Sequence, residues 1–179
     1  GRQAPETASP TAPRELVSSI RAEPRGFNRY TGRDSVTETI THLTQARLVR
    51  IDRRTQELEP WLAESWSTSP DGLEWTLKLR QGVTFSDGEP FTAADVLFSF
   101  RAIYDPGVAS PMGEAMRVGG KPLEVSAPDP STVVIRFPAP FGPGIRLLDN
   151  LPILPRHKLE AALDAGTFVK AWDGAAPVG

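Results

Sequence analysis

The sequence predicts an α+β fold built from antiparallel hairpins and short helices. Two segments, 66–80 and 121–137, alternate apolar and polar residues on either side of turn sequences, which is typical of half-buried hairpin strands. A helical pattern over 92–104 lies between them, and 18 prolines are too many for a helical bundle. Hairpins and helices in this order indicate antiparallel strand pairs and not a parallel doubly wound sheet.

Composition excludes several classes of protein. At 179 residues the chain can form one domain or slightly more, with 39% hydrophobic and 23% charged residues. A net charge of −2 gives no electrostatic footprint for nucleic acid, so we expect no nucleic-acid partner. The absence of cysteine rules out disulfides and thiolate metal sites. The sequence has no run of about 18 apolar residues, so it predicts no membrane-spanning segment.

The first 30 residues predict a tail, a strand and a loop. Residues 1–13 are polar and proline-rich, which predicts a disordered tail or linker. Residues 14–21 carry spaced apolar side chains and predict a strand. Proline at 24 and glycine at 26 predict that residues 23–30 form a loop.

A helix and a short strand are predicted next. Asp34 or Ser35 can cap a helix that runs to about Ala46. Its buried side is expected to hold Val36, Ile40, Leu43 and Leu48. Residues 48–51 predict a short strand, and residues 53–59 a surface turn.

The central stretch, 60–106, carries the strongest local signals. Trp75, Leu77 and Leu79 alternate with polar residues, and the turn sequence at 69–72 links this strand to a partner at 66–68. Thr92 and Asp95 form a capping box at the start of a helix. Its buried face is expected to hold Val96, Phe100, Ile103 and Tyr104, and Asp105-Pro106 ends it.

Shorter elements are expected after residue 106. They are a loop at 107–111, a helical turn at 112–117, hairpin strands at 121–127 and 132–137, a short helix at 141–148, an extended segment at 151–154, and a helix at 155–165.

Candidate catalytic and metal sites have simpler structural interpretations. His42 and His157 are the only histidines, and neither has carboxylates at metal-ligand spacing, so a surface or structural role is favoured. Residues 86–89 place two acids together but fit a turn better than a calcium site. No GxSxG motif is present. The sequence therefore predicts neither an enzyme nor a cofactor, and the large aromatic residues are expected in the core: Trp61, Trp66, Trp75 and Phe85.

The sequence of the central stretch resembles that of one protein family. LVRID at 48–52 is followed by PWLAESW, a DG turn, TLKLRQGVTFSDGEPFTAADVLFSF and YDP. In this order the motifs resemble the signature region of the family 5 extracellular solute-binding proteins, the peptide-, dipeptide- and nickel-binding receptors of ABC importers. The resemblance runs over roughly residues 14–157. Ser86 stands where many members carry histidine, and Leu77 where phenylalanine is common.

The resemblance implies a periplasmic-binding-protein-like fold of type II with an extra subdomain. Family members are longer and form two lobes around a cleft, so we expect an N-terminal fragment with an incomplete lobe. Residues 14–47 would then supply the first strand and helix of the main lobe, and 48–165 the extra subdomain. Residues 166–179 are expected to be a frayed end, since neighbours in the intact protein are missing.

The implied function is capture of a solute outside the cytoplasmic membrane, by lobe closure and without covalent chemistry. Oligopeptide or dipeptide is the first expectation for the ligand, and a nickel chelate, sugar or opine are alternatives. The implied partners are the transmembrane subunits of an ABC permease, at a periplasmic or cell-surface location. We expect that an export signal or lipid anchor was removed ahead of Gly1, and that the membrane is met only through such an anchor or the permease. A ligand-sensing domain of a transcription regulator is a further alternative, which a DNA-binding domain encoded upstream would reveal.

Candidate ligand-binding residues follow from the same resemblance. The loop after the first strand leads into the cleft in the family, and it carries Phe27, Asn28, Arg29 and Tyr30. Arginine and asparagine can bind carboxylates or amides, and tyrosine can pack and donate a hydrogen bond. The resemblance also brings Ser110, Met112 and Asn150 towards the cleft.

Overall fold

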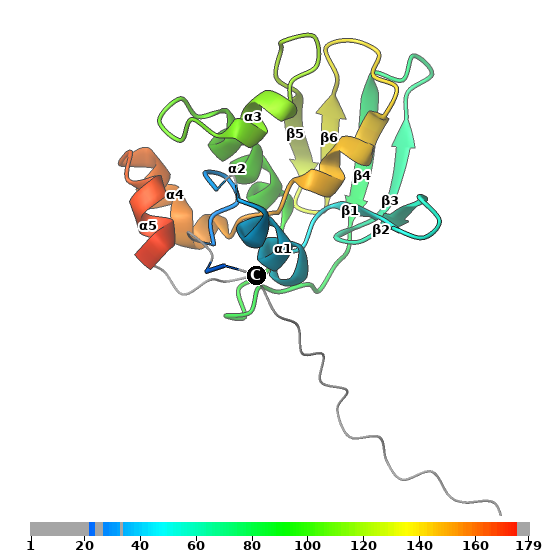
Figure 1. Ribbon diagram of the computed structural model, residues 1–179. Coiled ribbons are helices and arrows are strands. Elements are labelled where there is room, and N and C mark those ends of the chain that lie inside the picture. Colours follow the sequence, from blue (N-terminus) through cyan, green and yellow to red (C-terminus); the bar gives the residue numbers. More distant parts are fainter. Residues whose placement is uncertain (1–21, 24–26, 33, 175–179) are drawn as a thin grey trace, which may run out of the picture.

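The computed structural model describes residues 22–23, 27–32 and 34–174 (Figure 1). The expected tail at 1–13 and the expected strand at 14–21 lie outside these residues. The elements in chain order are α1 (Ser35–Thr44), β1 (Val49–Ile51), β2 (Leu58–Pro60), β3 (Ala63–Thr68), β4 (Glu74–Leu79), α2 (Ala93–Tyr104), α3 (Pro111–Ala115), β5 (Glu124–Asp129), β6 (Thr132–Arg136), the 3-10 helix η1 (Gly144–Asn150), α4 (Arg156–Asp164) and α5 (Phe168–Gly174).

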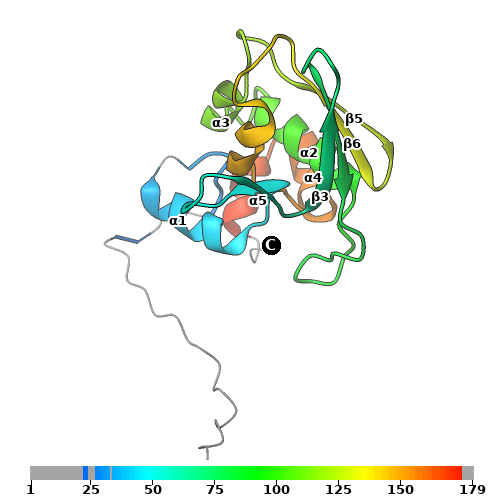
Figure 2. The same cartoon turned by 90° about the vertical axis from the view of Figure 1, so that its right-hand side faces the viewer.

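A four-stranded antiparallel sheet confirms both predicted hairpins. Its order is β3-β4-β6-β5. Trp75 lies opposite Ile135 and Leu77 opposite Val133, so the alternating apolar residues of both hairpins share one face. Figure 2 shows the sheet along one side of the molecule, and α2 contacts its strands β5 and β6.

The turn between β3 and β4 explains the register of the first hairpin. Asp71 Oδ1 accepts a hydrogen bond from the amide of Leu73 at 3.0 Å, and Gly72 adopts a φ of 71°. The amide of Ser69 donates to the carbonyl of Glu74 at 2.8 Å and closes the pair. The predicted turn is confirmed.

Helix α2 begins at the predicted capping box. Thr92 Oγ1 accepts from the amide of Ala94 at 3.3 Å, and Asp95 Oδ2 accepts from the amide of Thr92 at 2.9 Å. Val96, Phe100 and Ile103 are buried, as expected from their spacing. Asp95 Oδ1 also accepts from the amide of Arg156 at 3.0 Å, which connects α2 to the start of α4.

Helix α1 begins as predicted, and Leu48 after its end is buried as expected, but the predicted buried side of the helix itself is wrong. Asp34 Oδ1 accepts from the amide of Thr37 at 2.8 Å and caps the helix. The fully buried positions are Thr37 and Thr41, whereas Leu43 is 76% exposed. The threonines can be buried because their hydroxyls bond within the helix region, that of Thr41 to the carbonyl of Glu38.

Strand β2 is a second correction, since residues 53–59 were expected to form only a surface turn. Leu58 pairs with Ile51 in a small antiparallel ladder between β1 and β2. The intervening turn is held by Asp52 Oδ1, which accepts from the amides of Arg54 and Thr55 at 2.6 and 3.1 Å. A three-residue strand carries too little periodicity to be detected from sequence.

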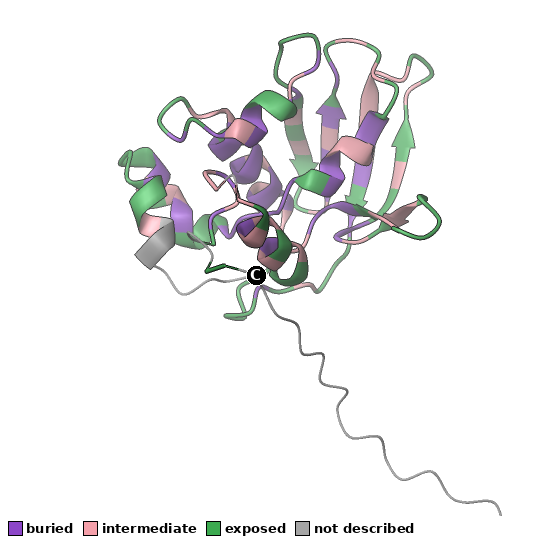
Figure 3. Ribbon diagram, in the orientation of Figure 1, coloured by how far each residue is buried: buried purple, intermediate pink, exposed green. Residues whose placement is uncertain are grey.

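The C-terminal elements pack against the N-terminal ones. Residues 151–154 are extended as predicted, and the amide of Ile153 donates to the carbonyl of Ala46 at 3.0 Å. Helix α4 follows as expected, but helix α5 was not predicted. Phe168 is buried at its start, so this end of the chain has a core contact (Figure 3).

The large aromatic residues divide between core and surface. Phe85 is buried, and Trp66 and Trp75 are half-buried against the core. Trp61 is a correction, because it stays partly exposed beneath the guanidinium of Arg50, 5.9 Å from its ring centroid. Among the described residues, no helix is long and apolar enough to cross a membrane.

Candidate functional site

The loop at residues 27–32 is held by a turn centred on Asn28. Asn28 Oδ1 accepts from the amide of Tyr30 at 3.0 Å, and the Asn28 carbonyl accepts from the amide of Gly32 at 2.8 Å. Asn28 is itself buried, and its Nδ2 has no hydrogen-bond partner. The loop therefore has a defined shape next to the start of α1.

Tyr30 fixes this loop to the C-terminal part of the chain. Its side chain is fully buried, and its hydroxyl donates to the carbonyl of Pro152 at 2.8 Å. The ring packs at a tilt against Phe168, with 6.2 Å between centroids. Burial raises the pKa of the Tyr30 hydroxyl far above its usual value, so the group stays neutral.

Phe27 and Arg29 are the accessible side chains of the same loop. Phe27 is 42% exposed. Arg29 Nη1 donates to the carbonyl of Gly32 at 3.2 Å, and its Nη2 lies 3.5 Å from Glu38 Oε1 on α1. A ligand could reach both residues without disturbing the core.

Ser110 and Met112 lie elsewhere, where α2 passes into α3. Both are buried, and Ser110 Oγ has no hydrogen-bond partner. A Cβ on the next residue, Gly113, would lie 2.1 Å from the carbonyl oxygen of Ile103, so α3 packs directly on the end of α2. Within the described part of the chain, no hydrogen bond or ion pair joins these two residues to the loop at 27–32.

Asn150 is exposed at the end of η1. It precedes Pro152 by two residues, so it lies on the segment that Tyr30 contacts. Asn150 is therefore close in sequence to a contact of the loop at 27–32, whereas Ser110 and Met112 lie at the α2–α3 junction.

A buried polar group between α1 and β1 was missed by the sequence analysis. Gln45 and Arg47 are both buried, and the Oε1 of Gln45 and the Nε of Arg47 have no hydrogen-bond partner. Gln45 continues the polar row of Thr37 and Thr41 at four-residue spacing. That spacing is the signal that could have identified a polar buried face.

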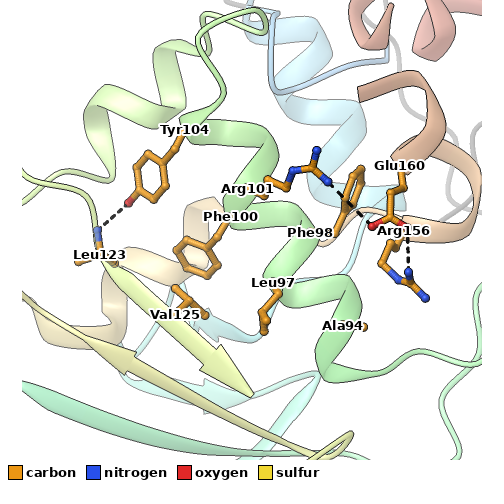
Figure 4. Close-up of a pocket in the computed structure, with 10 residues that line it drawn as sticks. All are labelled: Ala94, Leu97, Phe98, Phe100, Arg101, Tyr104, Leu123, Val125, Arg156 and Glu160. Carbon is orange, nitrogen blue, oxygen red and sulfur yellow. Dashed lines mark hydrogen bonds and ion pairs between the residues drawn. The ribbon is translucent and has the colours of Figure 1, made fainter. Parts of the chain in front are cut away.

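A groove lies along α2, between this helix, strand β5 and helix α4 (Figure 4). Its volume is about 530 Å³. Figure 4 shows Leu97, Phe100 and Val125 at its centre. At one end the hydroxyl of Tyr104 accepts from the amide of Leu123 at 3.1 Å and donates to the carbonyl of Met116 at 2.9 Å.

The other end of the groove is charged but internally neutralised. Arg156 Nη1 lies 2.8 Å from Glu160 Oε2, and Arg101 Nη1 lies 4.0 Å from Glu160 Oε1. Arg101 also pairs with Asp164. Each arginine already has an acidic partner, so this end offers no free cation to a ligand.

The turn at residues 86–89 is joined to α4 through Asp87. Asp87 Oδ2 lies 2.8 Å from His157 Nε2 and 3.2 Å from Lys158 Nζ. The His157 ring also packs against Phe85, with 5.5 Å between centroids. The hydrogen bond from His157 and then that from Lys158 hold the pKa of Asp87 at about 2.

The described residues contain no group of three histidine, cysteine, aspartate or glutamate side chains that could hold a metal ion. Asp87 and His157 form a pair that joins two segments. The turn expected at 86–89 is present, and His157 lies on the first turn of α4 as the sequence suggested.

Comparison with known proteins points to one family. Residues 57–179 match the sequence model described as bacterial extracellular solute-binding proteins, family 5 Middle. The chain is 33% identical over 139 residues to the probable D,D-dipeptide-binding periplasmic protein DdpA of Escherichia coli (strain K12). The aligned region covers 75% of this chain and 26% of DdpA.

Solved structures show the same similarity. The ABC transporter substrate binding protein CtaP of Listeria monocytogenes superimposes with a TM-score of 0.76 at 30% identity, over 89% of this chain and 31% of that one. OppA of Haemophilus influenzae in complex with RPPGFSPFR gives a TM-score of 0.71 at 29% identity, over 84% and 32% of the two chains. The chain thus spans about a quarter to a third of the length of these proteins.

Proposed function

Because this chain belongs to the bacterial extracellular solute-binding proteins of family 5, we propose that it helps to capture a solute outside the cytoplasmic membrane for an ABC importer. The observation that carries the proposal is the family match over residues 57–179. The agreement in fold with CtaP and OppA supports it. The partners would be the transmembrane subunits of the permease, and the location would be periplasmic or extracytoplasmic.

The proposed ligand is an oligopeptide or dipeptide. Two of the similar proteins support this class, since one is named as a D,D-dipeptide-binding protein and the other is solved with the peptide RPPGFSPFR. Binding would occur by closure of two lobes over the ligand, with no change in the ligand's covalent bonds. A binding role without catalysis accords with relatives that are named as binding proteins.

We place the ligand beside the loop at residues 27–32. Phe27 and Arg29 would contact it directly, because their side chains are accessible on this loop. Asn150 is exposed two residues before Pro152 and would be a further contact. Asn28 and Tyr30 would instead shape the loop, since both are buried and bonded to their own chain. Ser110 and Met112 are buried at the α2–α3 junction and would reach a ligand only after a rearrangement.

The same proposal divides the chain into two parts. Residues 48–165 would form the extra subdomain of the lobe, and residues 14–47 would belong to the main lobe. The hydrogen bond from Tyr30 to Pro152 would then hold the two parts together.

A binding screen tests the proposed function. Because closure needs two lobes, the protein is used with both lobes present. It is mixed with a panel of di- to nonapeptides, binding is measured by calorimetry, and chromatography shows whether the peptides stay intact. We expect at least one peptide class to bind and to be recovered intact. Cleaved peptides would contradict the binding role, and the absence of heat with every peptide would contradict the ligand class.

A further inference from the structure

Arg47 is the bulkiest of the fully buried side chains, with 1% of its surface exposed. Among the described residues, the one hydrogen bond that its guanidinium donates runs from Nη1 to the carbonyl of Gln45, at 3.2 Å. Its Nε is sealed from solvent without a partner. No carboxylate of the described residues lies within ion-pair distance of it, and a buried cation in this state is costly because neither charge nor hydrogen bonds compensate its lost hydration.

The acidic residues nearest to Arg47 are engaged with other groups. Asp149 and Glu38 favour its charge from a distance, while Arg29 and Arg53 oppose it. Asp149 Oδ1 accepts from the amide of Ile51 at 3.1 Å, and Glu38 Oε1 lies 3.5 Å from Arg29 and 3.8 Å from His42. Burial lowers the pKa of Arg47, yet an arginine remains charged in proteins.

The position of Arg47 connects it to the proposed ligand side. Arg47 forms an isolated bridge with Pro152, whose carbonyl accepts from Tyr30 of the loop at 27–32. Two further unpartnered buried polar atoms belong to this region of the chain, Oε1 of Gln45 beside Arg47 and Nδ2 of Asn28 in the loop. The region where the loop, α1 and the segment after η1 meet therefore contains buried hydrogen-bond donors and an acceptor that no described residue satisfies.

We propose that Arg47 binds a carboxylate group of the transported solute. The proposal rests on the proposed function, since a peptide ligand carries a C-terminal carboxylate. A guanidinium matches a carboxylate through two parallel N–H···O bonds, one of which would use the unpartnered Nε. Without ligand the guanidinium is sealed, so binding requires its flexible side chain to rotate towards the carboxylate.

The first test uses formate, the smallest carboxylate, and the thermal unfolding of this chain. Arg47→Met keeps an unbranched side chain of similar length and removes the charge, and Arg54→Met, at an exposed position, is the matched control. Because an uncompensated buried charge is removed, Arg47→Met should raise the unfolding midpoint by roughly 3–10 °C in chloride, and Arg54→Met should leave it unchanged. Formate in place of chloride at equal ionic strength should raise the midpoint of the wild type and of Arg54→Met more than that of Arg47→Met.

A fall in the midpoint of Arg47→Met would show that Arg47 is a structural residue and would overturn the proposal. Equal formate effects in all three proteins would also overturn it.

The second test uses the protein with both lobes present and compares a binding peptide with its C-terminal amide. In the wild type the free carboxylate should improve the dissociation constant at least about 30-fold, and Arg47→Met should abolish this preference. A preference that survives in Arg47→Met would overturn the proposal while leaving the proposed function intact. If no peptide binds the wild type, the peptide ligand class fails, and the formate measurement alone decides the role of Arg47.

Discussion

The hydroxyl of Tyr30 donates a hydrogen bond to the carbonyl of Pro152, 122 residues further along the chain, at 2.8 Å. This contact joins the N-terminal loop to the segment between η1 and α4, and the ring of Tyr30 extends it to Phe168 on α5. The two ends of the described chain therefore share one buried junction. The loop that we place beside the ligand is held by this junction.

Tyr30→Phe should destabilise the protein by about 1–3 kcal/mol, because the buried carbonyl of Pro152 would lose its partner while the ring packing stays. Chemical denaturation with urea measures the difference. Phe27→Leu changes a partly exposed position of the same loop and should shift the free energy of unfolding by less than about 0.5 kcal/mol. Equal stability of Tyr30→Phe and the wild type would show that the hydrogen bond contributes nothing net.

Gly113→Ala should destabilise the protein by about 2 kcal/mol or more, because the new Cβ would meet the carbonyl oxygen of Ile103 at 2.1 Å. The helix pair α2–α3 would have to move apart to relieve this contact. Gly142→Ala is the control, since nothing lies within 4 Å of a Cβ at that exposed position. A loss in Gly113→Ala no larger than in Gly142→Ala would contradict the close packing of α3 on α2.

Thr92→Ala should cost about 1 kcal/mol of stability, because the side-chain half of the capping box is lost at the start of α2. Thr39 offers a control: it lies exposed in the middle of α1, where its hydroxyl donates to the carbonyl of Ser35, and alanine there should be near neutral. Thermal unfolding of both variants at neutral pH makes the comparison. The expectation fails if the two substitutions have the same effect.

Acid should weaken the connection between Asp87 and α4. The pKa of Asp87 lies at about 2 in the folded chain, against about 4 in an unfolded one, with the hydrogen bond from His157 as the largest cause. A depressed pKa stabilises the folded state above the unfolded value, and this stabilisation is lost as the pH falls from about 4 to about 2. Asp87→Asn should therefore be less stable than the wild type near neutral pH and approach it near pH 2.

The free energy of unfolding, measured by urea titration at several pH values, tests this sign. Glu64→Gln, at an exposed site on β3, should keep the pH dependence of the wild type. A difference between Asp87→Asn and the wild type that stays constant from pH 7 to about pH 2 would exclude the proposed contribution of Asp87.

Local signals in the sequence predicted much of the fold. The hairpin of β3 and β4 and the start of α2 follow from residues close in sequence: Asp71 and Gly72 form the turn, and Thr92 and Asp95 form the cap. Their physical causes act within a few residues, so no knowledge of the tertiary structure is needed.

Features that depend on contacts between distant residues could not be predicted from the sequence. Strand β2 is defined by its pairing with β1. The spacing of Val36, Ile40 and Leu43 suggested an apolar buried side of α1, but Thr37 and Thr41 occupy it, because neighbouring elements decide which side of a helix is covered.

The candidate site was harder to predict than the fold. The sequence pointed to the loop that contains Tyr30 but could not reveal that this side chain turns inwards to Pro152. The sequence analysis did not single out Arg47, and its burial without an ionic partner among the described residues is what distinguishes it. Burial of charge depends on the whole fold and leaves no local pattern.

Native mass spectrometry of the protein purified from its own host, without refolding, tests the proposed function most directly. We predict a mass excess that matches a bound peptide. Denaturing the protein should release this peptide chemically unchanged, and the peptide should bind again to the ligand-free protein. A protein that carries no solute and binds none of the peptides extracted from its host's surroundings, or one that returns them cleaved, would contradict the proposed role as a peptide-binding receptor.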